Sequence, residues 1–429
     1  MPTNCFLALV FVLFRGESQR TRPAHQSAST GELFPMPPWL RLSIAGSATL
    51  LVGMGIGRFS DTPLIPALVD SGALSASEAG YVGAFNLAGY LIGALVALRI
   101  RTRWGETRTL KACLVISLIC LTASIAEFGF AWLVFWRSLI GITVAVMMIY
   151  SLAIVTRHAP PEHLGTATGI VFTGVGVGIL LSGTLIPALL DHSLSAAWAG
   201  LAVLGAAGVA IGFWGWGAVN LIASVSPTTA SAAATAPRSL GRPPITPAIL
   251  RLIAGQTMFS LGLLPHTIYW VDYLVRGLGH DIAFGGFHWV LFGLGAVSGT
   301  FLWGRLADRL GFRTGLVLVF CTLAVGVALP AIETAFWALA VSSLVVGAQP
   351  GFSAIMSGRT HQIVGPVHMA HVWRWMALIS GAFQAVGGYA YVMLFDRTGS
   401  YGAVFLIGGA AMALGALISV VPGKSRLSA

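Results

Sequence analysis

Five ionisable side chains stand inside stretches of the sequence that are otherwise apolar. Arg58 is followed at i+3 by Asp61, so a helix would place both on one face, one turn apart. Arg137 stands in a later apolar stretch, and His266 and Asp272 share a third. Charged groups inside a membrane are costly and mark substrate, ion or proton pathways. Because carboxylates and imidazoles exchange protons, these five residues are candidates for proton coupling or for the wall of a substrate cavity.

Three of these residues also have a structural interpretation. Arg58 and Asp61 can already lie at the outer membrane interface, where charged side chains reach out to water. His266 can be a hydrogen-bonded histidine within the helix packing, and Asn86 can either serve a cavity or bond between helices. The sequence leaves these alternatives open.

The sequence lacks the motifs of enzymatic chemistry. Neither H-E-x-x-H nor G-x-S-x-G occurs, and neither Lys111 nor Lys424 ends a phosphate-binding loop of the form G-x-x-x-x-G-K-[ST]. The 4 cysteines include no C-x-x-C pair, so neither a zinc site nor a disulfide framework is implied. We therefore expect no enzyme activity, no bound metal and no cofactor.

The composition requires lipid as the main solvent. Of the 429 residues 56% are hydrophobic and 9% charged, whereas soluble domains carry about 25% charged residues. The net charge of +10 could suggest nucleic acid as a partner. The basic residues, however, lie in short clusters between apolar runs, as in the loops of membrane proteins, and this excludes nucleic-acid binding.

The elements that must position the candidate residues are membrane-spanning helices, each of about 20 mostly apolar residues. The sequence predicts an all-α membrane protein with twelve such spans, beginning near Leu40, Ala79, Leu110, Ala131, Ala167, Ala196, Leu250, Gly285, Thr314, Phe336, Met369 and Tyr401. Residues 222–247, rich in Ser, Thr, Ala and Pro, predict a flexible linker between six and six spans. We expect a disordered tail over 1–38 and six-helix bundles over 39–221 and 248–429.

The basic residues also predict the orientation. Most of the 24 Lys+Arg residues fall in loops on one side of the predicted spans, and this side is the cytoplasm. Both termini and the linker are therefore expected to be cytoplasmic, in a bacterial cytoplasmic (inner) membrane. The run Cys5–Phe14 has no preceding basic residue, so a cleaved signal peptide is not favoured over an unstructured arm or a misassigned start.

A loop motif follows the eighth predicted span. The residues Gly304-Arg-Leu-Ala-Asp-Arg-Leu-Gly-Phe-Arg313 resemble the cytoplasmic signature G-x-L-A-D-R-x-G-R of the major facilitator superfamily. The copy in the first half, 98–108, has Thr102 in place of the aspartate. The resemblance implies a gating loop, whose members here are Arg305, Asp308, Arg309 and Arg313. Asp308 would then bind a helix N-terminus of the neighbouring half in one state. The alternative is a solvated basic loop.

Further motifs support and narrow this resemblance, which covers essentially 39–421. Arg137 to Gly141 resembles the R-x-x-x-G element of the superfamily, and 55–59 with 277–279 resembles its YbfB/YjiJ branch. Glycines of the first half recur in the second, as expected for parallel repeats. The resemblance implies two pseudo-symmetric six-helix bundles with the first, fourth, seventh and tenth spans around a central cavity. In that fold Asp61 would face both Arg58 and Arg137, or exchange a proton there.

These observations predict a secondary transporter that moves a small organic solute by alternating access and is coupled to protons. The expected partners are the solute, protons and membrane lipid, with the protein acting as a monomer. The alternative is a membrane sensor or scaffold that has the same fold and does not transport.

Overall fold

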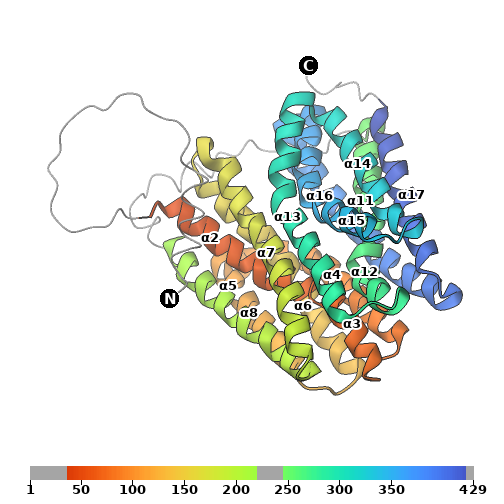
Figure 1. Cartoon of the computed structure of the whole chain (residues 1–429). Helices are drawn as coiled ribbons and strands as arrows, with labels where there is room; N and C mark the ends of the chain where they lie inside the picture. Colours follow the sequence, from red (N-terminus) through yellow and green to blue (C-terminus); the bar gives the residue numbers. More distant parts are fainter. Residues whose placement is uncertain (1–35, 220–244, 422–429) are drawn as a thin grey trace, which may run out of the picture. The chain divides into compact units, whose positions relative to one another are not determined.

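The computed structural model describes residues 36–219 and 245–421. The predicted tail and linker lie almost entirely outside these two ranges. The described residues form helices joined by short turns, and no strand occurs among them (Figure 1). The predicted all-α class is thereby confirmed.

The helices of the first described range are, in chain order, α2 (Pro38–Leu50), the π-helical η1 (Leu51–Arg58), α3 (Asp61–Asp70), α4 (Ala76–Trp104), α5 (Glu106–Ala123), α6 (Phe130–His158), the 3₁₀-helical η2 (Pro161–His163), α7 (Leu164–Leu190) and α8 (Leu194–Trp216). Those of the second range are α11 (Pro247–Gly262), the π-helical η4 (Pro265–Tyr269), α12 (Trp270–Asp272), the π-helical η5 (Tyr273–Gly277), α13 (Ile282–Leu310), α14 (Phe312–Ala328), the 3₁₀-helical η6 (Leu329–Ala331), α15 (Phe336–Gly347), α16 (Pro350–Thr398) and α17 (Tyr401–Val420).

Each predicted span begins within a different helix of this series. Among the described residues, 10 helical segments are long and apolar enough to cross a membrane, or up to 11 if Phe336–Gly347 and Pro350–Gly365, bent by 42°, form one span. The other predicted span is α5, which has 18 residues and carries Glu106, Arg108 and Lys111 near its start. The total of twelve therefore stays a prediction.

Two glycines turn the chain sharply between consecutive helices. Gly105 follows α4 with φ 78°, and Gly311 follows α13 with φ 81°. Glycine reaches this left-handed region without the steric cost that a Cβ would bring. The N–H of each glycine is hydrogen-bonded to the last turn of its helix, at the carbonyls of Arg101 and Ala307. Because these glycines hold corresponding places in the sequence repeat, both halves contain the same turn.

Helices α4 and α6 pack backbone to backbone through glycines. A Cβ added at Gly141 would lie 2.1 Å from the carbonyl oxygen of Asn86, and one at Gly89 would lie 2.1 Å from that of Ser138. No side chain fits at these distances, and small residues are what lets membrane helices approach so closely. The contact holds Asn86 of α4 against the turn of α6 that follows Arg137.

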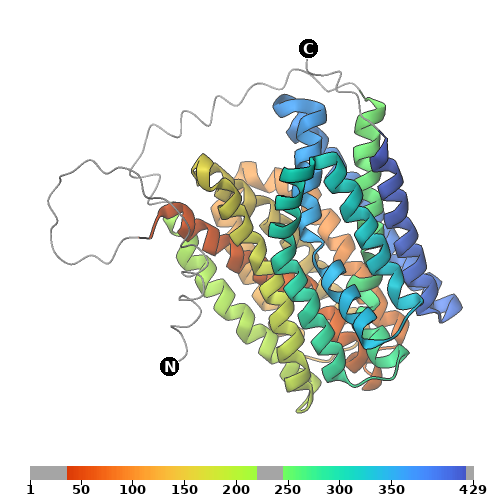
Figure 2. The ribbon, with the colours of Figure 1, turned by 45° about the horizontal axis from the view of Figure 1, so that its top comes forward.

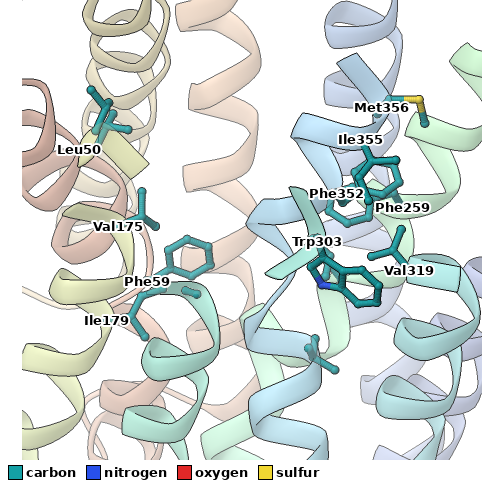
Figure 3. Packing of buried hydrophobic residues seen from close by; sticks show 14 of the residues in the cluster. Leu50, Phe59, Val175, Ile179, Phe259, Trp303, Val319, Phe352, Ile355 and Met356 are labelled. Carbon is teal, nitrogen blue, oxygen red and sulfur yellow. The ribbon is translucent and has the colours of Figure 1, made fainter. Parts of the chain in front are cut away.

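Elements far apart in the sequence meet along two helix pairs. In Figures 1 and 2 the yellow α7 lies beside the teal α13, and this pair packs along much of its length. Helix α4 packs in the same way on α16. Figure 3 shows buried apolar side chains of the core, with Val175 and Ile179 of α7 near Phe59 and with Phe259 of α11 beside Phe352 of α16. The last two rings stack with centroids 3.7 Å apart.

Candidate functional site

The first and seventh predicted spans lose regular α-helix where the candidate residues stand. Arg58 is the last residue of η1, and Asp61 is the first residue of α3. In the seventh span His266 lies in η4, and Asp272 ends α12 directly before η5. Because π-helical turns are rare and occur frequently at functional sites, both segments are candidate sites.

Asp61 and Arg137 form a buried ion pair between α3 and α6. Arg137 Nη1 lies 3.0 Å from Asp61 Oδ1, and the two side chains are 0% and 8% exposed. Arg137 also donates to Ser124 Oγ at 3.3 Å and to the carbonyl of Gly57 at 3.4 Å. Its Cζ lies 4.4 Å from the centroid of the Trp198 ring, whose face attracts a cation. Both charges are therefore balanced within the protein.

The pair keeps one free acceptor. Within the part of the chain that the structure describes, Asp61 Oδ2 and Arg137 Nε are buried and make no hydrogen bond. A proton on Oδ2 would remove the charge of Asp61 and leave Arg137 without its counter-ion. Because an uncompensated charge is unfavourable inside a membrane, proton binding here can change which arrangement of helices is most stable.

Arg58 takes no part in this ion pair. Its Nη1 lies 3.9 Å from Met54 Sδ, and its guanidinium lies 5.6 Å from the ring of Phe59 and 5.4 Å from that of Tyr90. Among residues 36–219 and 245–421 it forms no ion pair. The structure thus brings Asp61 to Arg137 and leaves the other arginine of the predicted group without an acidic partner.

A small cavity lies beside both Arg58 and Asp61. Its volume is about 20 Å³, enough for about one water molecule. Asn86 of α4 contributes to its wall, and Thr267 and Ile268 of η4 close it from the second half of the chain. The cavity therefore lies where the first and seventh predicted spans meet.

A second polar cluster contains Asp272. Tyr401 Oη donates to Asp272 Oδ2 at 2.6 Å, and Arg276 Nη1 lies 3.1 Å from Asp272 Oδ1. Arg276 Nε also lies 3.7 Å from Asp70 Oδ1, whose side chain is 62% exposed. No hydrogen bond or ion pair of the described residues joins this cluster to Asp61. Asp272 is thus buried, and Arg276 joins it to the exposed Asp70 of α3.

His266 is buried and held by hydrogen bonding and stacking. Its Nε2 lies 2.8 Å from Ser342 Oγ, whose own proton goes to the carbonyl of Gly326 at 2.7 Å. A hydroxyl donates only one proton, so Nε2 carries a hydrogen and donates it to Ser342. The ring stacks on Trp270 with centroids 4.5 Å apart, and Nδ1 has no partner among the described residues. These contacts match the structural interpretation of His266.

The predicted gating residues lie at the junction of α13 and α14. Arg305, Asp308 and Arg309 occupy the last two turns of α13 and are exposed, and Arg313 donates to the carbonyl of Val420. Asp308 makes no ion pair or hydrogen bond with the residues that the structure describes. The contact between Asp308 and a helix N-terminus is therefore not formed in this conformation, and its role as a latch stays a prediction.

Several residues of the site were not found by sequence reasoning. Ser124 and Trp198 contact Arg137 from outside α6, and nothing in their sequence surroundings marks them. His288 of α13 is also buried, with Nδ1 3.1 Å from Ser343 Oγ. Its place within an apolar stretch is the same signal that identified His266, so this residue could have been found.

The sequence match decides the family. The model of a family described as "Uncharacterised MFS-type transporter YbfB" matches residues 50–420. The chain belongs to this family. The resemblance seen in the loop motif is thereby confirmed, since MFS denotes the major facilitator superfamily. The family consists of transporters and not of enzymes, and the chain is a multi-pass membrane protein.

Two further similarities agree with this family. The 3-(3-hydroxy-phenyl)propionate transporter of Escherichia coli (strain K12) is 28% identical over 262 residues, covering 58% of this chain and 60% of that protein. The chain thus matches less than two thirds of that relative. The crystal structure of a D-xylose-proton symporter superposes with a TM-score of 0.68 at 15% identity, over 90% of this chain and 98% of that one. The second similarity concerns the fold alone.

Proposed function

We propose that this protein is a secondary active transporter that moves a small organic solute across the bacterial cytoplasmic membrane by alternating access, driven by protons. Membership of a transporter family supports the transport activity, and the name of the Escherichia coli relative supports an organic solute. In major facilitators two halves of the chain rock around a site near the midplane of the membrane. The substrate cavity is then opened to one side at a time.

The proposed architecture has twelve spans in two six-helix bundles, 39–221 and 248–429. Helix α5 and the bent pair of α15 with the first part of α16 complete the twelve spans. Both termini, the tail 1–38 and the linker 222–247 lie in the cytoplasm, and one copy of the chain is the working unit. The positive-inside distribution of Lys+Arg supports this orientation.

The proton site in this proposal is the ion pair of Asp61 and Arg137. The observation that supports it is the buried Asp61 Oδ2, which has no partner within the described ranges, in a residue that lines the cavity. Thr62, the next residue, donates from its Oγ1 to the carbonyl of Thr267 in the second half of the chain. This contact adjoins the ion pair, so protonation of Asp61 would change the charge beside a contact that must break when the two halves of the chain separate.

Transport by purified protein in proteoliposomes tests the proposal. The candidate solutes form a panel of aryl carboxylates, sugars and amino acids. Uptake of each solute is measured with and without an inward proton gradient. We expect the wild-type protein to accumulate one class of solute only with the gradient. Asp61→Asn should abolish accumulation and keep exchange of solute at equal pH, because exchange does not require the acid to release its proton.

The matched control is Asp70→Asn, the same change at the exposed end of α3, which should keep gradient-driven accumulation. If Asp61→Asn accumulates solute as the wild type does, the coupling site lies elsewhere, and His266 with Asp272 is the next pair for the same test. If well-folded wild-type protein moves no solute of the panel, the sensor or scaffold alternative is favoured.

A further inference from the structure

Arg58 is a partly buried guanidinium that forms no ion pair with the residues that the structure describes. Arg137 has Asp61, and Arg276 has Asp70 and Asp272. Within residues 36–219 and 245–421, the only hydrogen bond of Arg58 is to a thioether sulfur at 3.9 Å, and the acid that lines the same cavity, Asp61, is paired with Arg137. A guanidinium has five N–H donors, and leaving them unsatisfied within a membrane protein is costly. The position is therefore suited to an anion that comes from outside the chain.

The surroundings of Arg58 favour one planar anionic group beside an apolar body. The rings of Phe59 and Tyr90 lie within cation–π distance of the guanidinium and restrict its orientation. In the cavity wall Asn86 donates from Nδ2 to the carbonyl of Gly57, and its buried Oδ1, which has no partner among the described residues, is an acceptor and so would suit a donor group of a solute rather than its anionic group. Leu87 and other apolar side chains complete the wall.

We propose that Arg58 binds the carboxylate of the transported solute, so that the substrates are small organic carboxylates with an apolar body. This inference rests on the proposed transport function and names its substrate class. The planar fork of a guanidinium matches a carboxylate through two parallel hydrogen bonds. A neutral sugar would leave the charge of Arg58 unbalanced, and a phosphate dianion would leave one negative charge unbalanced at a single arginine.

The cavity in this conformation is too small for such a solute. With about 20 Å³ it holds about one water molecule. It is closed by Thr267 and Ile268, which belong to the second half of the chain, against residues of α3 and α4 from the first half. When the halves separate at the contact between Thr62 and Thr267, the space beside Arg58 enlarges and the carboxylate can enter.

Binding to the purified full-length protein tests this inference without requiring transport. The probes are 3-phenylpropionate and its neutral analogue 3-phenylpropanamide, with butyrate and succinate as further carboxylates, in equilibrium dialysis against protein in lipid nanodiscs. We expect the wild type to bind at least one carboxylate and to bind the amide about tenfold or more weakly, because hydrogen bonds to charged groups are the strong ones. Equal binding of acid and amide, or no binding of any carboxylate, would overturn the inference.

The variants assign this binding to Arg58. Arg58→Gln should lower carboxylate affinity about tenfold or more and leave binding of the amide unchanged. Arg58→Lys keeps the charge but loses the planar pair of N–H donors, so its carboxylate affinity should lie between those of the wild type and Arg58→Gln. Arg41→Gln is the control, because Arg41 is in the same predicted span but donates to the carbonyl of Trp214 at 2.7 Å. Unchanged carboxylate affinity in folded Arg58→Gln, or in Arg58→Lys if the first variant does not fold, would refute the role of Arg58.

The outcome separates this inference from the proposed function. If the proteoliposomes transport a sugar or an amino acid, and Arg58→Gln transports it normally, the carboxylate assignment fails and the transporter proposal stands. If Arg58 binds a carboxylate and the well-folded protein transports no solute of the panel, the binding site stands and the transporter proposal fails.

Discussion

Replacing Arg137 with methionine removes the counter-ion of Asp61 and keeps a long side chain in its place. Breaking a buried ion pair by removing one partner costs about 3–5 kcal/mol, because the other charge is left uncompensated. The pair here meets that condition, since its atoms are 3.0 Å apart and the side chains are 0% and 8% exposed. We therefore expect Arg137→Met to lower the free energy of unfolding by about 3 kcal/mol or more.

The contacts of Arg137 indicate that most of this loss comes from Asp61. The hydrogen bonds to Ser124 and Gly57 are long, at 3.3 and 3.4 Å, and such neutral acceptors contribute about 0.5–1.5 kcal/mol each at best. Adding Asp61→Asn removes the uncompensated charge. The double variant should therefore recover about 2 kcal/mol of the loss, a coupling within the range seen for residues in contact.

Equilibrium denaturation in mixed detergent micelles measures the coupling from the wild type, both single variants and the double variant. Lowering the pH should also stabilise Arg137→Met relative to the wild type, because Asp61 can then take up a proton. Arg41→Met with Asp61→Asn forms the control cycle, since these residues stand twenty positions apart in one predicted span, about 30 Å at 1.5 Å per residue, and should couple by less than about 0.5 kcal/mol. Additive effects of Arg137→Met and Asp61→Asn would refute the reasoning.

Two further predictions concern topology and gating. A reporter inserted after Ser231, in the predicted linker, should lie in the cytoplasm and one at Ser71 outside; a cytoplasmic signal from both would contradict the twelve-span arrangement. Asp308→Asn should slow transport at normal expression, because it removes a charge that a helix N-terminus stabilises by about 0.3–2 kcal/mol. An unchanged transport rate in the folded variant would favour the solvated-loop interpretation.

The helical class and the candidate residues could be read from the sequence. An apolar run long enough to cross a membrane can satisfy its backbone groups only as a helix, so composition and length suffice to place the helices. Arg58, Asp61 and Arg137 were identified in the same way, because a charge in such a run is conspicuous. The loop motif at 304–313 was enough to indicate the family, which the match over residues 50–420 confirms.

Only the tertiary structure decided which of these residues are partners. Asp61 pairs with Arg137, which stands 76 positions later in the sequence, and not with Arg58, which stands three positions earlier. The spacing i, i+3 implies a shared face only in a continuous α-helix. Here the π-helical η1 ends at Arg58 and a turn precedes α3, so the regular spacing is interrupted between the two residues.

Which side chains meet between two helices depends on how far each helix is shifted along the membrane normal and on how it is rotated about its own axis. Side-chain periodicity within one helix determines neither quantity. The glycine contact of α4 with α6 brings Asn86 of one helix close to the turn of the other helix that follows Arg137. The same applies to Asp272, which is bound by Arg276 on its own segment and by Tyr401 from α17. A sequence shows which charges must find partners in a membrane, but the close packing of helices determines which atoms meet. It paired Asp61 with Arg137 and left Arg58 beside the same cavity with no ion-pair partner among the described residues.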